Sequence, residues 1–408
     1  MKKILIICPI VPYPENGAEQ SDRANGIRQL IRLGYEVRVI AKRRKYQSDE
    51  DVDNFRKTVS GISVKTVTYK YTLSSNSFAK KVQLIFKRIL NPKFYDGAAF
   101  EYFDPEIQNV VHNEINSWRP DLVWFEYTYL WPLFHIAKKN NIPIVTRSIN
   151  YEPKHFLDED GRNALNLLRA IPKYISEYRV VKDSQIVFSI TPDENAVYFG
   201  LGGKKVVTLP LRGLHVMSQH TVRENILTSQ TPINLYFMGS TYNVSHNKQA
   251  AKFIITQLAP EIFKHFGSEF IINIIGAKLP DDLISSIPPN VQYLGFVQDL
   301  DLFLGNMDIA IVPSLYGAGM QQKIFEPLMR GFPTIVSSRG LAGYNFEDGN
   351  DVLIADSIDQ YVDKLKYLKS NPSELKRIGD RARSKSLKLF SIDVIDRTVK
   401  EALNGVLD

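Results

Sequence analysis

The chain has 408 residues, of which 44% are hydrophobic and 23% charged, and its formal net charge is +7. Single hydrophobic cores stop growing at about 250–300 residues, so this length predicts two domains. No stretch approaches the roughly 20 apolar residues of a transmembrane helix, and basic clusters such as residues 42–45 lack interleaved aromatic side chains. These features argue against a membrane-spanning protein and against a nucleic-acid partner.

Apolar runs alternate with amphipathic helical patterns, which is typical of a parallel sheet covered on both faces. Residues 3–10 are predicted to form a buried strand rather than a signal peptide, because Pro9 interrupts the run and no small-residue cleavage site follows. A helix is predicted over residues 21–33, ended by Gly34. Further strands are predicted over residues 36–41, 122–125, 143–147 and 185–190. The lone cysteine, Cys8, excludes an intramolecular disulfide and fits a reducing cytoplasm.

The segment 78–90 combines an apolar stripe with basic residues on its other faces. Such a helix can lie on an anionic membrane, and this predicts peripheral contact of a cytoplasmic protein with the inner face of a membrane. The alternative is a helix that packs on its own domain, which is an ordinary arrangement in globular proteins.

The second half of the chain repeats the α/β pattern. Strands are predicted over residues 234–239, 270–276, 291–297, 309–313 and 333–337, with a helix over residues 248–265. Residues 209–232 lack a clear period and contain Pro210 and Gly213, so they are predicted to form the domain junction and hinge. The predicted fold is α/β, with two Rossmann-like domains facing a cleft. We expect domains at 1–210 and 211–388, with a terminal helix in 389–408 that crosses back to the first domain.

The segment 317–336, GAGMQQKIFEPLMRGFPTIV, follows a predicted buried strand, at the edge where parallel sheets bind ligands. Gly319 permits close backbone approach, and the first turn of the next helix offers free N–H groups to an anion. Lys323 can neutralise a diphosphate, and Glu326 can accept hydrogen bonds from both hydroxyls of a ribose. The alternative is that Lys323, Glu326 and Arg330 form ordinary surface pairs on a helix. Because Pro327 lacks an N–H, the helix is predicted to begin near residue 322.

This segment resembles the donor site of family 4 glycosyltransferases of the two-domain, twin-Rossmann type. The stretch LYFMGSTYNVSHNKQAAKFI resembles the phosphate loop and helix that open the second domain of that family, and VQYLGFVQDLDLFLGNMDIAIVPS resembles its base-binding strand. The resemblance covers the carboxyl-terminal half almost continuously. In the amino-terminal half it is limited to PYPENGAEQ and, more loosely, TRSINYEPKHF.

Carried over by position, the resemblance assigns roles to individual residues. Glu326 matches the second glutamate of the family's Glu-x7-Glu motif, which contacts the ribose, and Gly17 matches the glycine-rich first loop. The remaining donor-binding residues implied are those of the diphosphate loop (Gly239, Ser240, Asn247 and Lys248), the base-binding segment (Gly295, Phe296 and Val297), and Gly319 with Lys323.

Two positions depart from the family pattern. Ala318 stands where the first glutamate would touch the donor sugar, and Ile149 stands where many relatives have a histidine near the anomeric carbon. Three residues after predicted strands of the first domain are therefore the catalytic candidates: Glu126, Asn150 and Glu152. Each also has a structural alternative, because a polar residue at a strand end is often only solvated.

The resemblance implies transfer of a hexose from a uridine or guanosine diphosphate sugar to a hydroxyl of a saccharide or lipid-linked acceptor. It also implies that the reaction retains the configuration of the sugar and uses neither a metal nor a cofactor. Two alternatives share the fold: a sugar-nucleotide epimerase, and a non-catalytic nucleotide-sugar-binding partner protein. A nicotinamide-dependent oxidoreductase is disfavoured, because no Gly-x-Gly-x-x-Gly follows the first strand.

Overall fold

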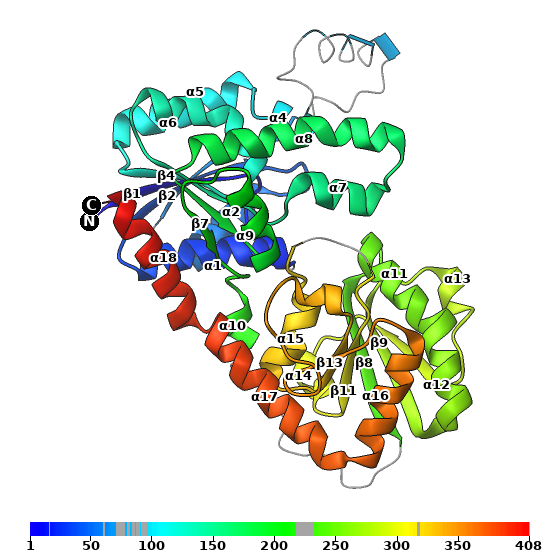
Figure 1. Cartoon of the computed structure of the whole chain (residues 1–408). Coiled ribbons are helices and arrows are strands. Elements are labelled where there is room, and N and C mark those ends of the chain that lie inside the picture. Colours follow the sequence, from blue (N-terminus) through cyan, green and yellow to red (C-terminus); the bar gives the residue numbers. More distant parts are fainter. Residues whose placement is uncertain are drawn as a thin grey trace. The chain divides into compact units, whose positions relative to one another are not determined.

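The computed structural model describes residues 1–15, 17–59, 62–70, 78–79, 82–83, 86, 90, 96–217, 232–315 and 319–407. The chain divides into two compact units (Figure 1). Unit 1 comprises Met1–Arg212 and Ile395–Asp408, and unit 2 comprises Gly213–Val394. The sequence had placed the two boundaries after residues 210 and 388. Most of the predicted hinge, residues 218–231, lies outside the described part of the chain.

Unit 1 contains a parallel sheet of seven described strands in the order β3-β2-β1-β4-β5-β6-β7. These strands are β1 (Lys3–Cys8), β2 (Glu36–Arg43), β3 (Ser63–Thr68), β4 (Leu122–Phe125), β5 (Ile144–Arg147), β6 (Ile186–Ser189) and β7 (Val206–Thr208). The helices are α1 (Ala18–Arg32), α2 (Asp49–Thr58), α4 (Gly97–Phe100), α5 (Pro105–Trp118), η2 (Thr128–Leu133), α6 (Phe134–Lys139), α7 (Glu152–Asp160), α8 (Ala164–Asp183), α9 (Pro192–Gly200) and α18 (Ile392–Leu407).

The alternation of side chains along β1 explains why helices cover both faces of this sheet. Ile4 and Ile6 pack into one core with residues of α1, α2 and α18, whereas Leu5 and Ile7 pack into another with residues of α5, α6 and α8. Successive strand residues point to opposite faces, so a strand that is apolar at every position is buried on both. The carboxyl-terminal helix α18 therefore completes the core of unit 1, through residues such as Val399 and Leu403.

Unit 2 contains a parallel sheet of six described strands in the order β10-β9-β8-β11-β12-β13. The strands are β8 (Ile233–Thr241), β9 (Phe270–Ala277), β10 (Val291–Gly295), β11 (Ile309–Val312), β12 (Thr334–Val336) and β13 (Leu353–Ile354). The helices are α10 (Leu214–Met217), α11 (Ser245–Phe253), η3 (Ile254–Leu258), α12 (Ala259–Phe266), η4 (Gly267–Glu269), α13 (Asp281–Ile284), α14 (Leu300–Leu304), α15 (Gln322–Arg330), η5 (Ser338–Leu341), α16 (Ile358–Ser370) and α17 (Pro372–Phe390).

The α/β class with two Rossmann-like units is confirmed, and the strands named above include every one that was predicted. Three edge strands, β3, β7 and β13, were missed because they are short or only partly buried, so their patterns are weak. The helix predicted over residues 248–265 begins earlier, at Ser245, and is interrupted by the π-helical turn Ile254–Leu258. In the described part of the chain, no helix is both long and apolar enough to span a bilayer.

In each sheet the strand order reverses between two neighbours, β1 and β4 in unit 1 and β8 and β11 in unit 2. Helices that follow two such strands leave toward opposite faces of the sheet, which opens a crevice at the carboxyl ends of the strands. Open α/β sheets bind their ligands at these switch points. The two candidate locations are therefore the loops after β1 and β4, and the loops after β8 and β11.

Candidate functional site

The switch point of unit 2 brings together the start of α11 and the start of α15. The side chain of Lys323, in the first turn of α15, donates a hydrogen bond of 2.9 Å to Oδ1 of Asn247 on α11. Asn247 is buried, and its Nδ2 donates to the Thr241 carbonyl at the end of β8. A predicted donor-site lysine and a residue of the predicted diphosphate loop are thus in direct contact, although 76 positions separate them in the sequence.

Lys323 is a half-buried cation whose described partners are neutral. Its Nζ lies 5.5 Å from the centroid of the Phe237 ring. Burial lowers the pKa of Lys323 to about 7, and no charged group of the described chain offsets that effect. A buried ammonium without a counter-ion is costly, and an anion bound beside it would recover that cost. This side chain is therefore prepared for a negatively charged ligand.

Two glycines allow the backbone at this edge to take positions closed to other residues. Gly319, in the loop before α15, has φ +70°. Gly276, at the end of β9, has φ +134°, and a Cβ there would lie 2.0 Å from the carbonyl oxygen of Gly239 on β8. The ends of β8 and β9 therefore lie too close together for any side chain at Gly276. Ala318, the departure from the family motif, lies outside the described residues.

Glu326 lies one turn after Lys323 in α15 and is 3% exposed. Its Oε1 accepts a 3.0 Å hydrogen bond from Nε of Arg330, and its Oε2 accepts a 3.2 Å bond from Nε2 of Gln322. Arg330 also donates to Asp301. The Glu326–Arg330 pair is buried, which differs from the surface pairing that was the alternative. Within the described chain, Oε1 of Glu326 is bound by the cation of Arg330, and Oε2 is bound only by the amide of Gln322.

The start of α15 agrees with the prediction from Pro327. The helix begins at Gln322, so Lys323 and Glu326 occupy its first turns. The opposite face is buried, through Ile324, Phe325, Leu328 and Met329. This face fixes the helix against the sheet and aims its N-terminal end, with its free N–H groups, at the edge where Lys323 lies.

The other predicted donor residues occupy the surface of the same edge. Ser240 and Lys248 are exposed, and Val297 is half-buried. Phe296, directly after β10, is 74% exposed. A large aromatic ring at the carboxyl end of a strand offers an unoccupied face on which a planar base can stack.

In unit 1 the predicted candidate Glu126 belongs to a buried ionic network. Its two oxygens accept bonds of 3.0 and 2.9 Å from the guanidinium of Arg212. Asp22 accepts from Arg212 and Arg147, and all four side chains are at most 1% exposed. Burial alone would raise the pKa of Asp22, but the two guanidinium groups outweigh burial and hold that pKa well below its usual range. Arg147 also donates to the carbonyls of Leu209 and Pro210, so the network fixes the chain just before unit 2 begins.

The candidate Asn150 lies in the loop between β5 and α7, and Glu152 is the first residue of α7; both are half-buried. Glu152 accepts a hydrogen bond from the Tyr127 hydroxyl, and Nζ of Lys173 donates to it at 3.1 Å. Gly17, the remaining candidate of unit 1, is the residue before the first turn of α1, at the end of the loop after β1. The predicted residues of unit 1 thus follow β1, β4 and β5 at one edge of the sheet.

Two buried glutamates that the sequence did not indicate hold the loop of Asn150 and Glu152. Oε1 of Glu194 accepts from the backbone N of Tyr151 at 2.9 Å, and Oε1 of Glu177 accepts from the backbone N of Glu152 at 3.3 Å. Burial raises the pKa of Glu194 to about 7. Burial, with the nearby carboxylate of Glu152, raises the pKa of Glu177 to about 8.

A count of protons supports a protonated Glu177. Its Oε2 lies 3.0 Å from the Tyr198 hydroxyl, which lies 2.7 Å from Oγ of Ser148, which lies 2.9 Å from the Asn150 carbonyl oxygen. These three contacts need three protons, but the two hydroxyls supply only two. A proton on Glu177 completes the chain of hydrogen bonds and so positions the backbone at Asn150.

Comparisons with known proteins relate unit 2 to a glycosyltransferase family and both units to solved structures. Residues 232–371 match the model of the family described as glycosyl transferases group 1. No curated protein sequence matches the chain. Among solved structures, Anabaena HepE in complex with UDP is 13% identical with a TM-score of 0.65, over 99% of this chain and 100% of that one. Sucrose-phosphate synthase from Thermosynechococcus elongatus is 12% identical with a TM-score of 0.67, over 100% and 99%.

A third solved structure, TarM, is 12% identical with a TM-score of 0.68, over 100% of this chain and 99% of that one. At such identities the likeness establishes the fold alone, and it extends over both units. The family match adds a glycosyltransferase domain whose span includes Gly239, Asn247, Lys323 and Glu326. Together these findings support a glycosyltransferase of the GT-B fold, with a group 1 domain in residues 232–371.

Proposed function

We propose that the chain transfers a hexose from a uridine or guanosine diphosphate sugar to a hydroxyl of a saccharide or lipid-linked acceptor. The observation that carries this proposal is the half-buried ammonium of Lys323, which is held by the neutral side chain of Asn247 at the N-terminal end of α15. The solved structures of HepE with UDP and with UDP-glucose share the fold and support a donor of this class.

The charge of the departing diphosphate explains why the proposed site has a lysine at the N-terminal end of a helix. As the bond from the anomeric carbon to the diphosphate oxygen breaks, negative charge grows on the diphosphate. Lys323 and the free N–H groups in the first turn of α15 are fixed before the reaction, so they stabilise that charge without reorganising. This arrangement supplies the positive charge from the protein itself and needs no metal.

The rest of the nucleotide is assigned to neighbouring residues. We assign the ribose to Oε2 of Glu326, because Arg330 holds the other oxygen and keeps the carboxylate in place. We assign the base to the exposed ring of Phe296, and the diphosphate to the backbone around Gly239 and Gly319 together with Lys323. Ser240, Lys248 and Val297 line the same loops and complete the proposed contact set.

We propose that configuration is retained. In that step the acceptor oxygen bonds to the anomeric carbon on the face from which the diphosphate leaves, and the acceptor proton passes to a diphosphate oxygen. Asn150 and Glu152 then orient the acceptor, and Glu126 supports unit 1 through its ion pair with Arg212. If configuration is instead inverted, Glu152 is the candidate base, because it is less buried than Glu126.

Thermal shifts with nucleotides test the donor site. The parent chain is expected to gain stability with UDP or GDP but not with uridine or guanosine, since the diphosphate provides the contact to Lys323. Lys323→Ala and Glu326→Gln are expected to diminish the shift. The glutamine at position 326 is preferred to alanine because it keeps the packing beside Arg330.

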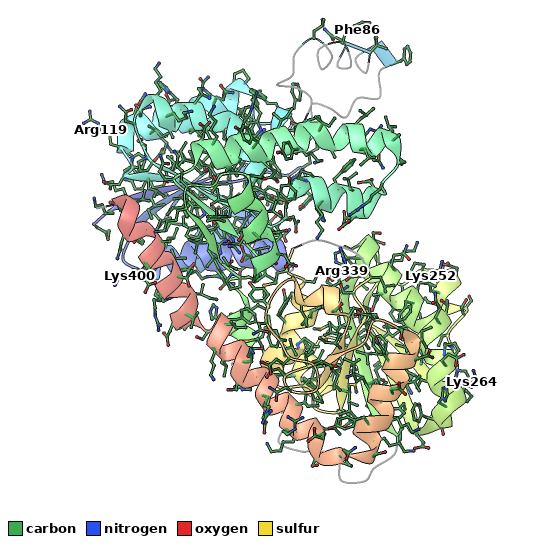
Figure 2. The ribbon with its side chains drawn as sticks, in the orientation of Figure 1. Phe86, Arg119, Lys252, Lys264, Arg339 and Lys400 are labelled. Atoms are coloured by element: carbon green, nitrogen blue, oxygen red, sulfur yellow. The ribbon has the colours of Figure 1, made fainter. Side chains whose placement is uncertain are left out.

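Lys252→Ala is the matched control. Lys252 is an exposed lysine of α11, and Figure 2 shows it on the outer side of that helix. This variant should keep the full nucleotide shift. Equal shifts in the parent, Lys323→Ala and Glu326→Gln would refute the proposed site. Binding that is lost in these variants, without donor turnover by the parent on any acceptor, would favour a non-catalytic nucleotide-sugar-binding protein.

A further inference from the structure

Arg23 is a fully buried cation that makes no hydrogen bond within the described chain. It lies in the second turn of α1, after the loop that follows β1, and it is 0% exposed. Its Nε, Nη1 and Nη2 all lack a hydrogen-bond partner. Two other arginines of unit 1 are buried about as deeply, but the side chain of Arg147 donates four hydrogen bonds and that of Arg212 donates three. A structural role therefore accounts for Arg147 and Arg212 but not for Arg23.

The ion-pair partner of Arg23 is Glu19, one turn earlier in α1. Nη2 of Arg23 lies 2.6 Å from Oε1 of Glu19, but the contact lacks the angles of a hydrogen bond. The side chain of Glu19 is 47% exposed. Removing a guanidinium from water is costly unless its N–H groups are bonded, and a half-exposed carboxylate recovers little of that cost. An anion with better geometry would recover more of it, because a guanidinium can bind two oxygens of one anion side by side.

The N-terminal end of α1 provides further donors at the same place. Side chains of a helix lean toward its N-terminal end, so the guanidinium of Arg23 reaches back toward the first turn. Gly17 is the N-cap residue and has no side chain that could bind the free N–H groups of that turn. These N–H groups also favour an anion. The place is the switch point of unit 1, between β1 and β4, where open α/β sheets bind ligands.

Tyr127 connects Arg23 to a candidate residue of the acceptor side. Cζ of Arg23 lies 5.8 Å from the centroid of the Tyr127 ring, and the Tyr127 hydroxyl donates a hydrogen bond to Glu152. The ring of Tyr129 stacks on that of Tyr127, with 4.2 Å between the centroids, and Tyr129 is half-buried. Aromatic rings beside a few convergent polar groups are typical of small-molecule sites. An anion at Arg23 would thus lie one aromatic ring away from Glu152.

We propose that Arg23 binds an anionic group of the acceptor, a carboxylate or a phosphate, which replaces the carboxylate of Glu19. The inference rests on the proposed function, because it assigns the anion to the acceptor that Asn150 and Glu152 orient. Glu19 is exposed enough to turn toward solvent when the anion enters. The acceptor class that fits is an acidic or phosphorylated saccharide rather than a neutral one.

Two kinds of acceptor share this chemistry. A uronic acid carries a carboxylate, whereas a phosphorylated or lipid-linked saccharide carries a phosphate. The segment 78–90, which was predicted to contact the membrane that holds a lipid-linked acceptor, lies largely outside the described residues. The probes are therefore glucuronate for the carboxylate, glucose 6-phosphate for the phosphate, and glucose as the neutral control.

Thermal shifts with these probes at millimolar concentration test the site. The full chain carries Lys323→Ala, so that anions are not bound by the lysine of the donor site. At least one anionic probe should raise the unfolding temperature, and the larger shift identifies the group, whereas glucose should have no effect. Adding Arg23→Met should abolish the shift.

A pair of matched variants tests the exchange with Glu19. Glu19→Gln should bind the anionic probe up to about fivefold more tightly, because the carboxylate that competes for Arg23 is gone. Glu15→Gln removes a carboxylate from the loop before the same helix, where it pairs with Arg28, and should not change the affinity.

The stability of Arg23→Met provides a test that needs no ligand. A buried arginine without hydrogen bonds contributes little to the fold, so this substitution should leave the unfolding temperature unchanged or raise it. Arg147→Met is the matched control, since it removes an equally buried arginine whose N–H groups are bonded, and it should lower the unfolding temperature by roughly 6 °C or more.

Several outcomes would overturn the proposal. If Arg23→Met unfolds at a temperature as low as that of Arg147→Met, Arg23 is a structural residue. The proposal also fails if neither anionic probe raises the unfolding temperature, if glucose raises it equally, or if Arg23→Met keeps the shift. Equal affinities of Glu19→Gln and Glu15→Gln would exclude the exchange. Failure of the proposed function is distinguishable, because it would appear as a UDP shift that Lys323→Ala leaves unchanged.

Discussion

The burial of Lys323 predicts that donor binding depends on pH in a specific direction. In the free protein burial lowers the pKa of this ammonium to about 7. A diphosphate bound beside Nζ favours the charged form and raises the pKa again, so binding takes up a proton at any pH above about 7. The affinity must then fall as the pH rises, because the free protein has to be protonated first.

The size of the effect follows from the two pKa values. If the bound pKa returns to the ordinary range of lysine, affinity falls about 16-fold, or about 1.6 kcal/mol, between pH 7 and pH 8.5. Isothermal titration calorimetry with UDP-glucose measures this, since its diphosphate diester does not titrate in that interval. Titrations in two buffers of different ionisation enthalpy give the number of protons taken up.

Two variants separate Lys323 from other groups that titrate. Lys323→Arg keeps its charge throughout, so any affinity that remains should be independent of pH. Lys323→Gln should bind weakly at every pH. A parent affinity that stays constant from pH 7 to 8.5, with no proton uptake, would refute the reasoning from the buried ammonium.

Three further predictions concern unit 1 and the base. Asp22→Asn leaves Arg147 and Arg212 short of a counter-charge and should lower the free energy of unfolding of unit 1 by about 3–5 kcal/mol. Urea unfolding followed by fluorescence measures this cost, because unit 1 contains all three tryptophans. A cost below about 1 kcal/mol would contradict a buried network. Folded Glu177 binds its proton more tightly than the unfolded chain does, so its contribution to stability is largest below the ordinary carboxyl pKa and is lost as the pH rises toward about 8. The melting temperature of Glu177→Gln should therefore depend less on pH between about pH 5 and 8 than that of the parent, and an identical pH dependence in both proteins would argue against the protonated carboxyl. Phe296→Ala should weaken nucleotide binding by about 1–3 kcal/mol in calorimetry without changing the melting temperature, and unaltered affinity would exclude stacking on this ring.

The sequence predicted those parts of the molecule that depend on local patterns. Apolar runs such as residues 3–10 predicted strands, because only a strand buried on both faces is apolar at every position. The start of α15 was predictable from Pro327, since a proline disrupts the helix only where an earlier turn already exists. The proximity of Lys323 to the segment after β8 was predictable because open α/β sheets bind ligands where the strand order reverses, and a Rossmann-like strand order places β8 and β11 side by side there.

The remaining features depend on contacts between distant parts of the chain. Nothing in the sequence near Glu126 indicates that Arg212, 86 positions later, binds both of its oxygens. The protonated state of Glu177 depends on burial and on the hydroxyls of Tyr198 and Ser148, which come from other elements. The leucines and isoleucines of α8 have the spacing of a core-facing helix, and only the packed structure reveals that they are exposed.

The most direct test of the proposed donor site is a crystal structure of the chain with a bound UDP sugar. The account predicts a diphosphate oxygen within hydrogen-bond distance of Lys323 Nζ and the ribose hydroxyls at Oε2 of Glu326. A diphosphate bound elsewhere, with Lys323 still bonded only to Asn247, would contradict it.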